Sequence, residues 1–237
     1  MKSYMINRII KSIKKILYNI PLNRDYHSFI SVYHESVNKW RFLKYRYFMT
    51  FSEKIYWPVH QHSEVRGRVI IGKGARVGHR PNCVIQGRGK VFIGDYVGIG
   101  PNCVIISANH VLLNQDDVVR KETIIGDYCW LASSSVILAG VTLGPRTIVG
   151  AGSVVTKSFN EGYCIIAGNP AKIIKRLDKE NFVQNRNKVE YYGYIRQDCF
   201  SKFAKRKLSH ITFDTDLRTF TSNIELLQLF CPIVKKD

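Results

Sequence analysis

The chain contains no run of eighteen apolar residues, so its sequence predicts no membrane-spanning helix. Its cysteines form no CxxC pair and none lies at zinc spacing from a histidine, which argues against a zinc site. The six are Cys83, Cys103, Cys129, Cys164, Cys199 and Cys231. We interpret the first three as small apolar residues that fill a core in a reduced cytoplasm.

Acidic residues are also scarce, because 18 Asp and Glu stand against 36 Lys and Arg, for a net charge of +18. The excess is spread along the chain, with +8 in residues 1–58 and +5 in each of residues 59–160 and 161–237. So wide a positive charge suggests an anionic ligand, glycan or membrane surface, with solubility alone as the alternative. We expect no nucleic acid partner, since the charge is dispersed and no recognised binding module is present.

What the sequence does contain is a six-residue repeat between positions 59 and 159. Fourteen hexapeptides place one aliphatic or small apolar residue in the same phase: Val59, Val65, Ile71, Val77, Cys83, Ile93, Ile99, Ile105, Ile125, Leu131, Ile137, Leu143, Val149 and Val155. This period fits a short strand followed by a tight corner, and it fits neither a helix face nor one two-sided strand. Three such units close a triangular coil, and stacked coils bury their apolar columns against one another. The sequence therefore predicts an all-β repeat, a triangular prism of about five coils over residues 59–160.

The repeat is interrupted twice. Its phase slips between Cys83 and Ile93, across residues 86–90, and the fourteen residues 111–124 leave the coil altogether. A loop that leaves a rigid scaffold is a usual place for binding or chemistry, although a tolerated insertion is the alternative. His110 stands at the start of this second loop, where a catalytic role and a structural role are the two alternatives.

The flanking segments differ from the repeat. Residues 4–20 predict an amphipathic helix, ended by Pro21, that either packs on the body or lies on an anionic bilayer. Its lysines interrupt any signal-peptide core. Residues 26–57 are rich in aromatic side chains and predict a cap for the open end of the prism, or a glycan platform. Residues 1–58 thus form the predicted N-terminal cap.

Two segments follow the repeat, a short terminal segment at 161–180 and a C-terminal extension at 181–237. A capping box from Ser222 to Glu225 predicts a short helix in the extension. A tyrosine cluster and a basic triplet there suggest a solvated or intersubunit face, or contact with an acceptor. These residues are Tyr191, Tyr192, Tyr194, Lys205, Arg206 and Lys207.

The repeats, the run GAGSVVTK and the run AGNPAK at residues 167–172 together resemble the hexapeptide-repeat acyltransferases, in particular bacterial sugar and polysaccharide O-acetyltransferases. The resemblance covers about residues 59–175. It implies a left-handed parallel β-helix, a homotrimer, and acetyl-coenzyme A as the donor co-substrate. The implied winding departs from the usual right-handed crossover.

The resemblance also implies roles for single residues. His110 matches the general base, and Asn82 loosely matches a sugar-binding asparagine. The positions that match the coenzyme A groove are Trp130, Ser133, Ala151, Thr156 and Lys157, and Lys172 and Lys175 match basic positions near the coenzyme's phosphates. Ser133 and Ala151 are eighteen residues apart, so the repeat predicts that they stack at one corner.

Neighbouring residues extend this site. Asp116 and Asp117 are candidates to orient the imidazole of His110, and His79, Arg80 and Arg88 would suit an anionic sugar beside Asn82. We expect no metal, because a metal-dependent carbonic anhydrase needs three converging imidazoles and the loop offers Gln115 and aspartates instead.

The leading hypothesis is an acetyl-coenzyme A-dependent O-acetyltransferase that acts on a sugar hydroxyl of a bacterial surface polysaccharide or its precursor. Imidazole can accept the hydroxyl proton near neutral pH. The enzymatic alternatives are N-acylation of an amino-sugar nucleotide and inactivation of an antibiotic, and a third alternative is a non-catalytic binding prism. We expect a cytoplasmic protein, with peripheral contact at the inner face of the membrane as a variant.

Overall fold

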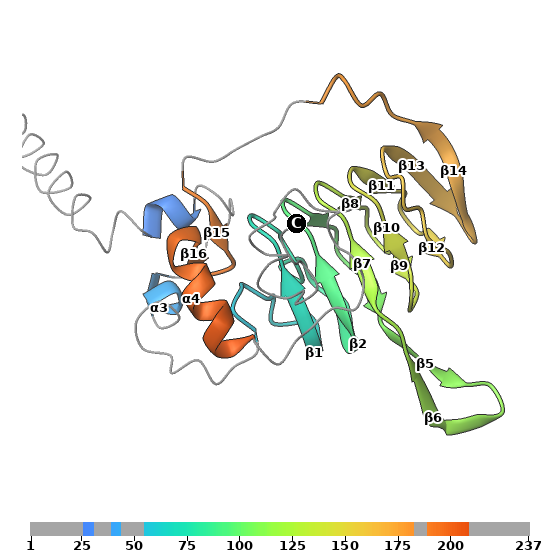
Figure 1. Cartoon of the computed structure of the whole chain (residues 1–237), viewed down its shortest axis with the longest axis horizontal. Helices are drawn as coiled ribbons and strands as arrows, with labels where there is room; N and C mark the ends of the chain where they lie inside the picture. The colour runs from blue at the N-terminus through green and yellow to red at the C-terminus, as the bar shows by residue number, and fades with distance from the viewer. Residues whose placement is uncertain (1–25, 31–38, 44–54, 183–188, 209–237) are drawn as a thin grey trace, which may run out of the picture.

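The computed structural model describes residues 26–30, 39–43, 55–182 and 189–208, which form a stack of short parallel strands with a cap at one end (Figure 1). The helices predicted at 4–20 and 222–230 lie outside these residues. Each coil of the stack passes through three flat faces in turn, as the strand pairing shows. This arrangement confirms the predicted solenoid of about five coils.

The first face holds the first halves of β1 (Glu64–Ile71) and β2 (Val84–Ile93), followed by β4 (Val104–Ile106), β9 (Val136–Ile137) and β12 (Val154–Val155). The second face holds the second halves of β1 and β2, followed by β7 (Thr123–Ile125) and β10 (Thr142–Leu143). The third face holds β3 (Gly98–Ile99), β8 (Trp130–Leu131), β11 (Thr147–Val149) and β13 (Cys164–Gly168), and β14 (Ala171–Arg176) pairs antiparallel with β13. The predicted left-handed winding stays a prediction, since pairing register does not specify the hand.

One aliphatic column per face forms the core. On the first face Ile105, Ile137 and Val155 are in register and fully buried. Each stacked side chain covers the one before it, so the apolar surface of a coil is removed from water only by its neighbours. Cys83, Cys103 and Cys129 are buried in this core as free thiols, which confirms that they act as apolar fillers.

The predicted phase is wrong at one position. Ile85, not Cys83, pairs with Ile105 on the first face, and Cys83 lies two residues earlier, where its carbonyl accepts from the backbone N–H of Glu64. The ten-residue slip is therefore two longer corners, one before Ile85 and one between Ile85 and Ile93. Both residues are buried, so burial pattern alone cannot separate the two assignments.

The predicted excursion at 111–124 begins earlier and ends earlier than expected. β5 (Ala108–Val111) and β6 (Asn114–Arg120) form an antiparallel hairpin that projects from the prism (Figure 1). Thr123 and Ile124 are back in the second face, where they are buried and Ile124 pairs with Phe92. The apolar side chain of Ile124 explains the return, because leaving the coil would expose it.

The cap combines both flanks of the repeat. Tyr56 and Trp57 are buried on the first coils, where the Tyr56 hydroxyl donates to the Ile71 carbonyl at 3.3 Å and the Trp57 indole donates to the Val77 carbonyl at 3.0 Å. Aromatic side chains that precede the repeat thus cover its first coils. α3 (Lys39–Leu43) belongs to the same end of the molecule (Figure 1).

The C-terminal part of the cap corrects a prediction. Tyr191, Tyr192 and Tyr194 are buried, so they form no solvated face. They lie in and beside the hairpin of β15 (Tyr191–Tyr192) and β16 (Ile195–Arg196), and Tyr192 stacks on Phe200 of α4 (Gln197–Lys207) with ring centroids 3.8 Å apart. The sequence did not predict α4, and the chain returns from the far end of the prism to place it (Figure 1).

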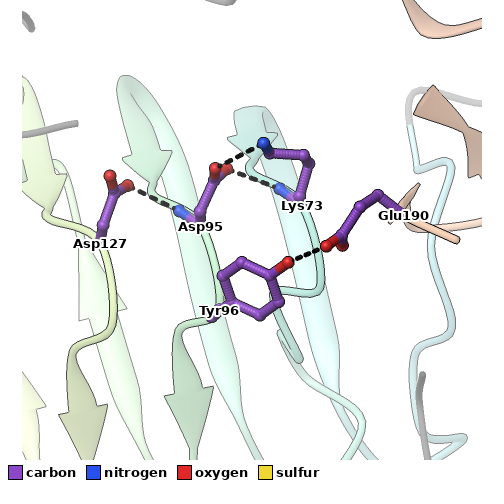
Figure 2. Close-up of polar contacts among 5 residues, drawn as sticks. All are labelled: Lys73, Asp95, Tyr96, Asp127 and Glu190. Carbon is purple, nitrogen blue, oxygen red and sulfur yellow. Dashed lines mark hydrogen bonds and ion pairs between the residues drawn. The ribbon is translucent and has the colours of Figure 1, made fainter. Parts of the chain in front are cut away.

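Buried carboxylates stack along the corner between the second and third faces (Figure 2). Asp127 accepts a hydrogen bond from the backbone N–H of Asp95 at 2.8 Å, and Asp95 accepts one from the backbone N–H of Lys73 at 2.8 Å. The Lys73 ammonium lies 3.4 Å from the other Asp95 oxygen. At the same corner the Tyr96 hydroxyl bonds Glu190 and so ties the prism to the cap. Burial, with a contribution from Asp127, raises the pKa of Asp95 to about 6, and Lys73 acts in the opposite direction.

This pKa predicts a pH-dependent stability. Between about pH 4 and pH 6 the folded protein holds a proton on Asp95 that the unfolded chain releases, so this contribution to stability falls as the pH rises. Asp95→Asn removes that titration, so its melting temperature relative to wild type should rise between about pH 4.5 and pH 7. Asp116→Asn removes a carboxylate at an exposed position and is the control for the loss of one negative charge. A difference from wild type that stays constant with pH for Asp95→Asn would contradict the prediction.

Candidate functional site

His110 lies on β5, in the projecting hairpin, and its side chain is exposed. Its Nδ1 lies 2.6 Å from the carbonyl oxygen of Gln115, across the turn of the hairpin. Since a carbonyl oxygen can only accept, Nδ1 carries the hydrogen, and in the neutral imidazole the lone pair is then on Nε2. The expected partners Asp116 and Asp117 do not bond the imidazole, and Asp117 accepts instead from the side chain of Asn114.

The stack that was predicted for Ser133 and Ala151 is present. Both are exposed at the corner between the third and first faces, and the N–H of Gly152 donates to the Ser133 carbonyl at 3.0 Å. Adjacent coils thus present adjacent backbone at this corner. An extended chain such as a pantetheine arm could lie along it.

Trp130 and Lys175 lie in one register row on the outer side of the third face. Trp130 pairs with Ile148, Ile148 with Ile165, and Ile165 with Lys175. The inner neighbours Leu131 and Val149 are buried, so this row faces outward, and Trp130 is 58% exposed. An exposed indole that leads to a lysine at the end of the prism suits a ligand with an apolar part and an anionic part.

Thr156 and Lys157 lie elsewhere, at the corner between the first and second faces, and both are exposed. A cavity of about 350 Å³ opens beside Lys157, and it is lined by Phe159, Glu161, Ile173 and Arg176 among others. Lys172 is exposed on β14 and does not line this cavity. Of the predicted coenzyme residues, Ser133 and Ala151 therefore lie at one edge of the first face and Thr156 and Lys157 at the other, while the remaining ones lie on the third face and β14.

Asn82 occupies a corner in the left-handed backbone conformation, with φ of 59°. Its side-chain amide donates to the Asn102 side chain of the next coil at 3.1 Å. Asparagine tolerates this conformation, which accounts for the residue without a ligand. His79 is buried and bonds the Arg76 carbonyl, and burial lowers its pKa to about 4, so the expected contact of His79 with an anionic sugar finds no support.

The outer side of the first face carries a column of valines in register: Val84, Val104, Val136 and Val154. Each is partly exposed, Val84 by 37%. The hairpin and Lys157 lie at one edge of this face, and Ser133 and Ala151 lie at the other. A flat apolar face between two candidate half-sites is suited to contact with another subunit.

Two features escaped the sequence analysis. The motif Ile-Gly-Asp-Tyr occurs at residues 93–96 and again at 125–128, and this repetition could have revealed the carboxylate stack. Lys90 lies in the first interruption of the repeat and Glu122 in the second, and the two side chains form a partly buried ion pair. Across the described ranges, no three His, Cys, Asp or Glu side chains gather as a metal site. No described helix is long and apolar enough to cross a membrane.

Comparison with known proteins agrees with the repeat. Residues 122–157 match the bacterial transferase hexapeptide (six repeats). A chloramphenicol acetyltransferase of Agrobacterium fabrum is 32% identical over 73 residues, which are 31% of this chain and 34% of that protein. A probable macrolide acetyltransferase of Lysinibacillus sphaericus is 34% identical over 79 residues, which are 33% of this chain and 43% of that protein. The chain thus spans less than half the length of these relatives.

One of the solved structures that are similar to this chain has low sequence identity to it. It is a hexapeptide-repeat containing acetyltransferase of Vibrio cholerae O1 biovar eltor, complexed with acetyl-coenzyme A, with a TM-score of 0.48 and 23% identity. The similarity covers 68% of this chain and 92% of that one.

Proposed function

We propose that this chain, whose residues 122–157 match the bacterial transferase hexapeptide (six repeats), is an acetyl-coenzyme A-dependent O-acetyltransferase that acts on a sugar hydroxyl. The acceptor we propose is a bacterial surface polysaccharide or its precursor. The positive charge of +18 supports an anionic acceptor.

In the proposed reaction, Nε2 of His110 takes the proton of the acceptor hydroxyl as the oxygen attacks the thioester carbonyl carbon. The carbon–sulfur bond then breaks, and the imidazolium returns the proton to the leaving thiolate of coenzyme A. His110 ends neutral, so one side chain serves as base and then as acid. No covalent enzyme intermediate is required.

One observation carries this proposal, the hydrogen bond from His110 Nδ1 to the Gln115 carbonyl, which leaves Nε2 as the proton acceptor. The test is transfer of radiolabelled acetyl from acetyl-coenzyme A to a panel of capsular and lipopolysaccharide oligosaccharides. Thermal shift with coenzyme A separates the enzyme from a non-catalytic prism, because ligand binding to the folded state raises the melting temperature. If the protein neither binds coenzyme A nor transfers acetyl, the proposal is overturned.

Antibiotic inactivation is the second candidate, because two relatives are named as chloramphenicol and probable macrolide acetyltransferases. The same radiolabelled assay with chloramphenicol and a macrolide as acceptors distinguishes it. Acetylation of these compounds and of no glycan would favour this second function. His110 would have the same role in both.

We propose that Lys172 and Lys175 bind the coenzyme's phosphates, since both are exposed on β14 and Lys175 shares a row with Trp130. Each charge-assisted contact is worth about 1.5 to 3 kcal/mol. The double change to alanine should therefore raise the KM for acetyl-coenzyme A at least about tenfold. Changing the exposed Lys202 and Lys205 of α4 to alanine removes equal charge and should leave KM unchanged. Equal KM values for both double variants would contradict the assignment.

We also propose a homotrimer, because Ser133 and Ala151 lie at one edge of the first face and Thr156 and Lys157 at the other, and a neighbouring copy would bring complementary edges together. Val136→Glu places a charge in the middle of the valine column and should convert the trimer to monomer in light scattering. Thr142→Glu, on the second face, should remain trimeric. A wild-type protein that is a stable and active monomer would contradict this prediction.

A cytoplasmic location belongs to the same proposal, with peripheral contact at the inner membrane face as the variant. It is supported by the free cysteines of the described chain and by the proposed use of acetyl-coenzyme A.

A further inference from the structure

The root of the hairpin adjoins the other interruption of the repeat. Gln86 pairs with Ile106 and Val91 pairs with Thr123, so the corner residues 87–90 of one coil lie beside the residues 107–122 that carry the hairpin in the next coil. The longer corner and the hairpin segment are thus neighbours in space, although they are at least 17 positions apart in the chain.

Backbone and hydroxyl groups join the two. The N–H of Gly89 donates to Ser107 Oγ at 2.9 Å, and that hydroxyl donates to the Gln86 carbonyl at 2.8 Å. The Ser107 carbonyl accepts a hydrogen bond from the backbone N–H of Lys121 at 2.9 Å, and this bond closes the hairpin at its root. A Cβ on Gly89 would lie 2.0 Å from the Ser107 carbonyl oxygen, so only glycine allows this approach.

An ion pair connects the segment between β6 and β7 to this corner. Lys90 Nζ lies 3.1 Å from Glu122 Oε1, and the side chains are only 12% and 15% exposed. The surface pair Arg66–Glu64 is 73% and 46% exposed, so water screens it far more. Removing one partner of a pair shielded from water leaves an uncompensated charge, so the two side chains act as a unit.

The backbone of Lys90 is unusual as well, because its φ is 87°, a region that side chains other than glycine rarely adopt. A turn at this φ would form more readily with glycine. Lysine at this position adds an ammonium group that glycine would lack. That group contacts Glu122, two residues after the end of β6.

We propose that Lys90 and Glu122 are positioning residues that hold the hairpin, and with it His110, in the orientation that acetyl transfer needs. The inference rests on the proposed function. Misplacing a catalytic group by about 1 Å can cost 10²-fold in rate, so a pair that fixes the root of its hairpin has a large effect on turnover. The pair does not touch the donor residues, so the KM for acetyl-coenzyme A is unaffected by it.

The test uses Lys90→Met, Lys90→Gly and Glu122→Gln in the full chain, with Lys90→Arg as the conservative variant and Arg66→Met as the matched surface control. We expect kcat about tenfold lower for the first three, an unchanged KM, partial recovery with arginine and no effect of the control. The double variant Lys90→Met with Glu122→Gln should be no slower than either single variant. Lys90→Gly distinguishes the two roles best. If Lys90 only formed the turn, glycine would replace it without loss of kcat, whereas a role of the ammonium group predicts a lower kcat.

Amide hydrogen exchange at Val119, which pairs with Asn109 in the hairpin, gives a readout that does not depend on activity, and exchange there should be faster in the three variants. Wild-type exchange and kcat in a folded Glu122→Gln variant would overturn the proposal, as would a lower melting temperature with unchanged kcat. If Lys90→Met does not fold, Glu122→Gln decides, because it keeps the shape of the side chain. If the wild type transfers no acetyl group, the proposed function fails, and hydrogen exchange alone judges the ion pair.

Discussion

His110→Ala should lower kcat by about 10²- to 10⁴-fold, the usual contribution of a positioned general base. In barrier height this is about 3 to 5.5 kcal/mol. The effect should fall on kcat, because the imidazole acts only as the acceptor oxygen attacks, whereas the coenzyme residues lie on the faces of the prism. The KM for acetyl-coenzyme A and the melting-temperature shift with coenzyme A should therefore stay as in wild type.

His110→Gln is a second variant that keeps a polar side chain of similar size and should be equally slow. His27→Ala removes another exposed imidazole, from the cap, and should retain full turnover. A histidine with a structural role would behave differently, since its loss would lower the melting temperature while the folded enzyme kept its rate. Transfer by His110→Ala at more than about a tenth of the wild-type rate would move the catalytic role to another residue.

Ile137→Ala should destabilise the protein by about 2 to 5 kcal/mol, the range for a truncated buried isoleucine. Ile137 is fully buried between Ile105 and Val155, so its loss leaves a cavity in the middle of the first-face column. Neighbouring coils cannot collapse into this space, because their spacing is set by backbone hydrogen bonds. Urea unfolding of wild type and variant measures the difference in midpoint.

Ile174→Ala is the matched control, because it makes the same change at a side chain that is 66% exposed on β14. It should cost less than about 0.5 kcal/mol, as surface changes usually do. Similar losses for the two variants would show that the column is not the main source of stability, and would contradict the stacked-coil account of the core.

The sequence by itself determined the prism. A coil of three strands places one apolar side chain inward on each face. Because each face takes about six residues, the six-residue period in the sequence predicts the fold. Ile99, Leu131 and Val149 were predicted from this period alone and are all buried in one column. The stack of Ser133 on Ala151 follows for the same reason, because an interval of eighteen residues is one coil.

The predictable part of the site was the part that lies on the repeat. The hairpin was predicted to exist, but its bounds were not, because Thr123 and Ile124 are assigned to the second face by contacts with Phe92 and Thr142 in other coils. The hydrogen bond between His110 and the Gln115 carbonyl was likewise not predicted. Every residue has a backbone carbonyl, so the residue type does not indicate which one accepts the bond.

Tertiary structure decided what depends on contacts between distant segments. The sequence around Tyr191 and Tyr194 suggested a solvated or intersubunit face. These side chains are buried against Phe29 and Phe42 because this part of the chain lies at the first coils. The pairing of Lys90 with Glu122 arises because one coil passes beside the next and brings residues 32 positions apart within 3.1 Å. A periodic pattern specifies which side chains turn inward, whereas the meeting of two interruptions of that pattern depends on how the coils stack.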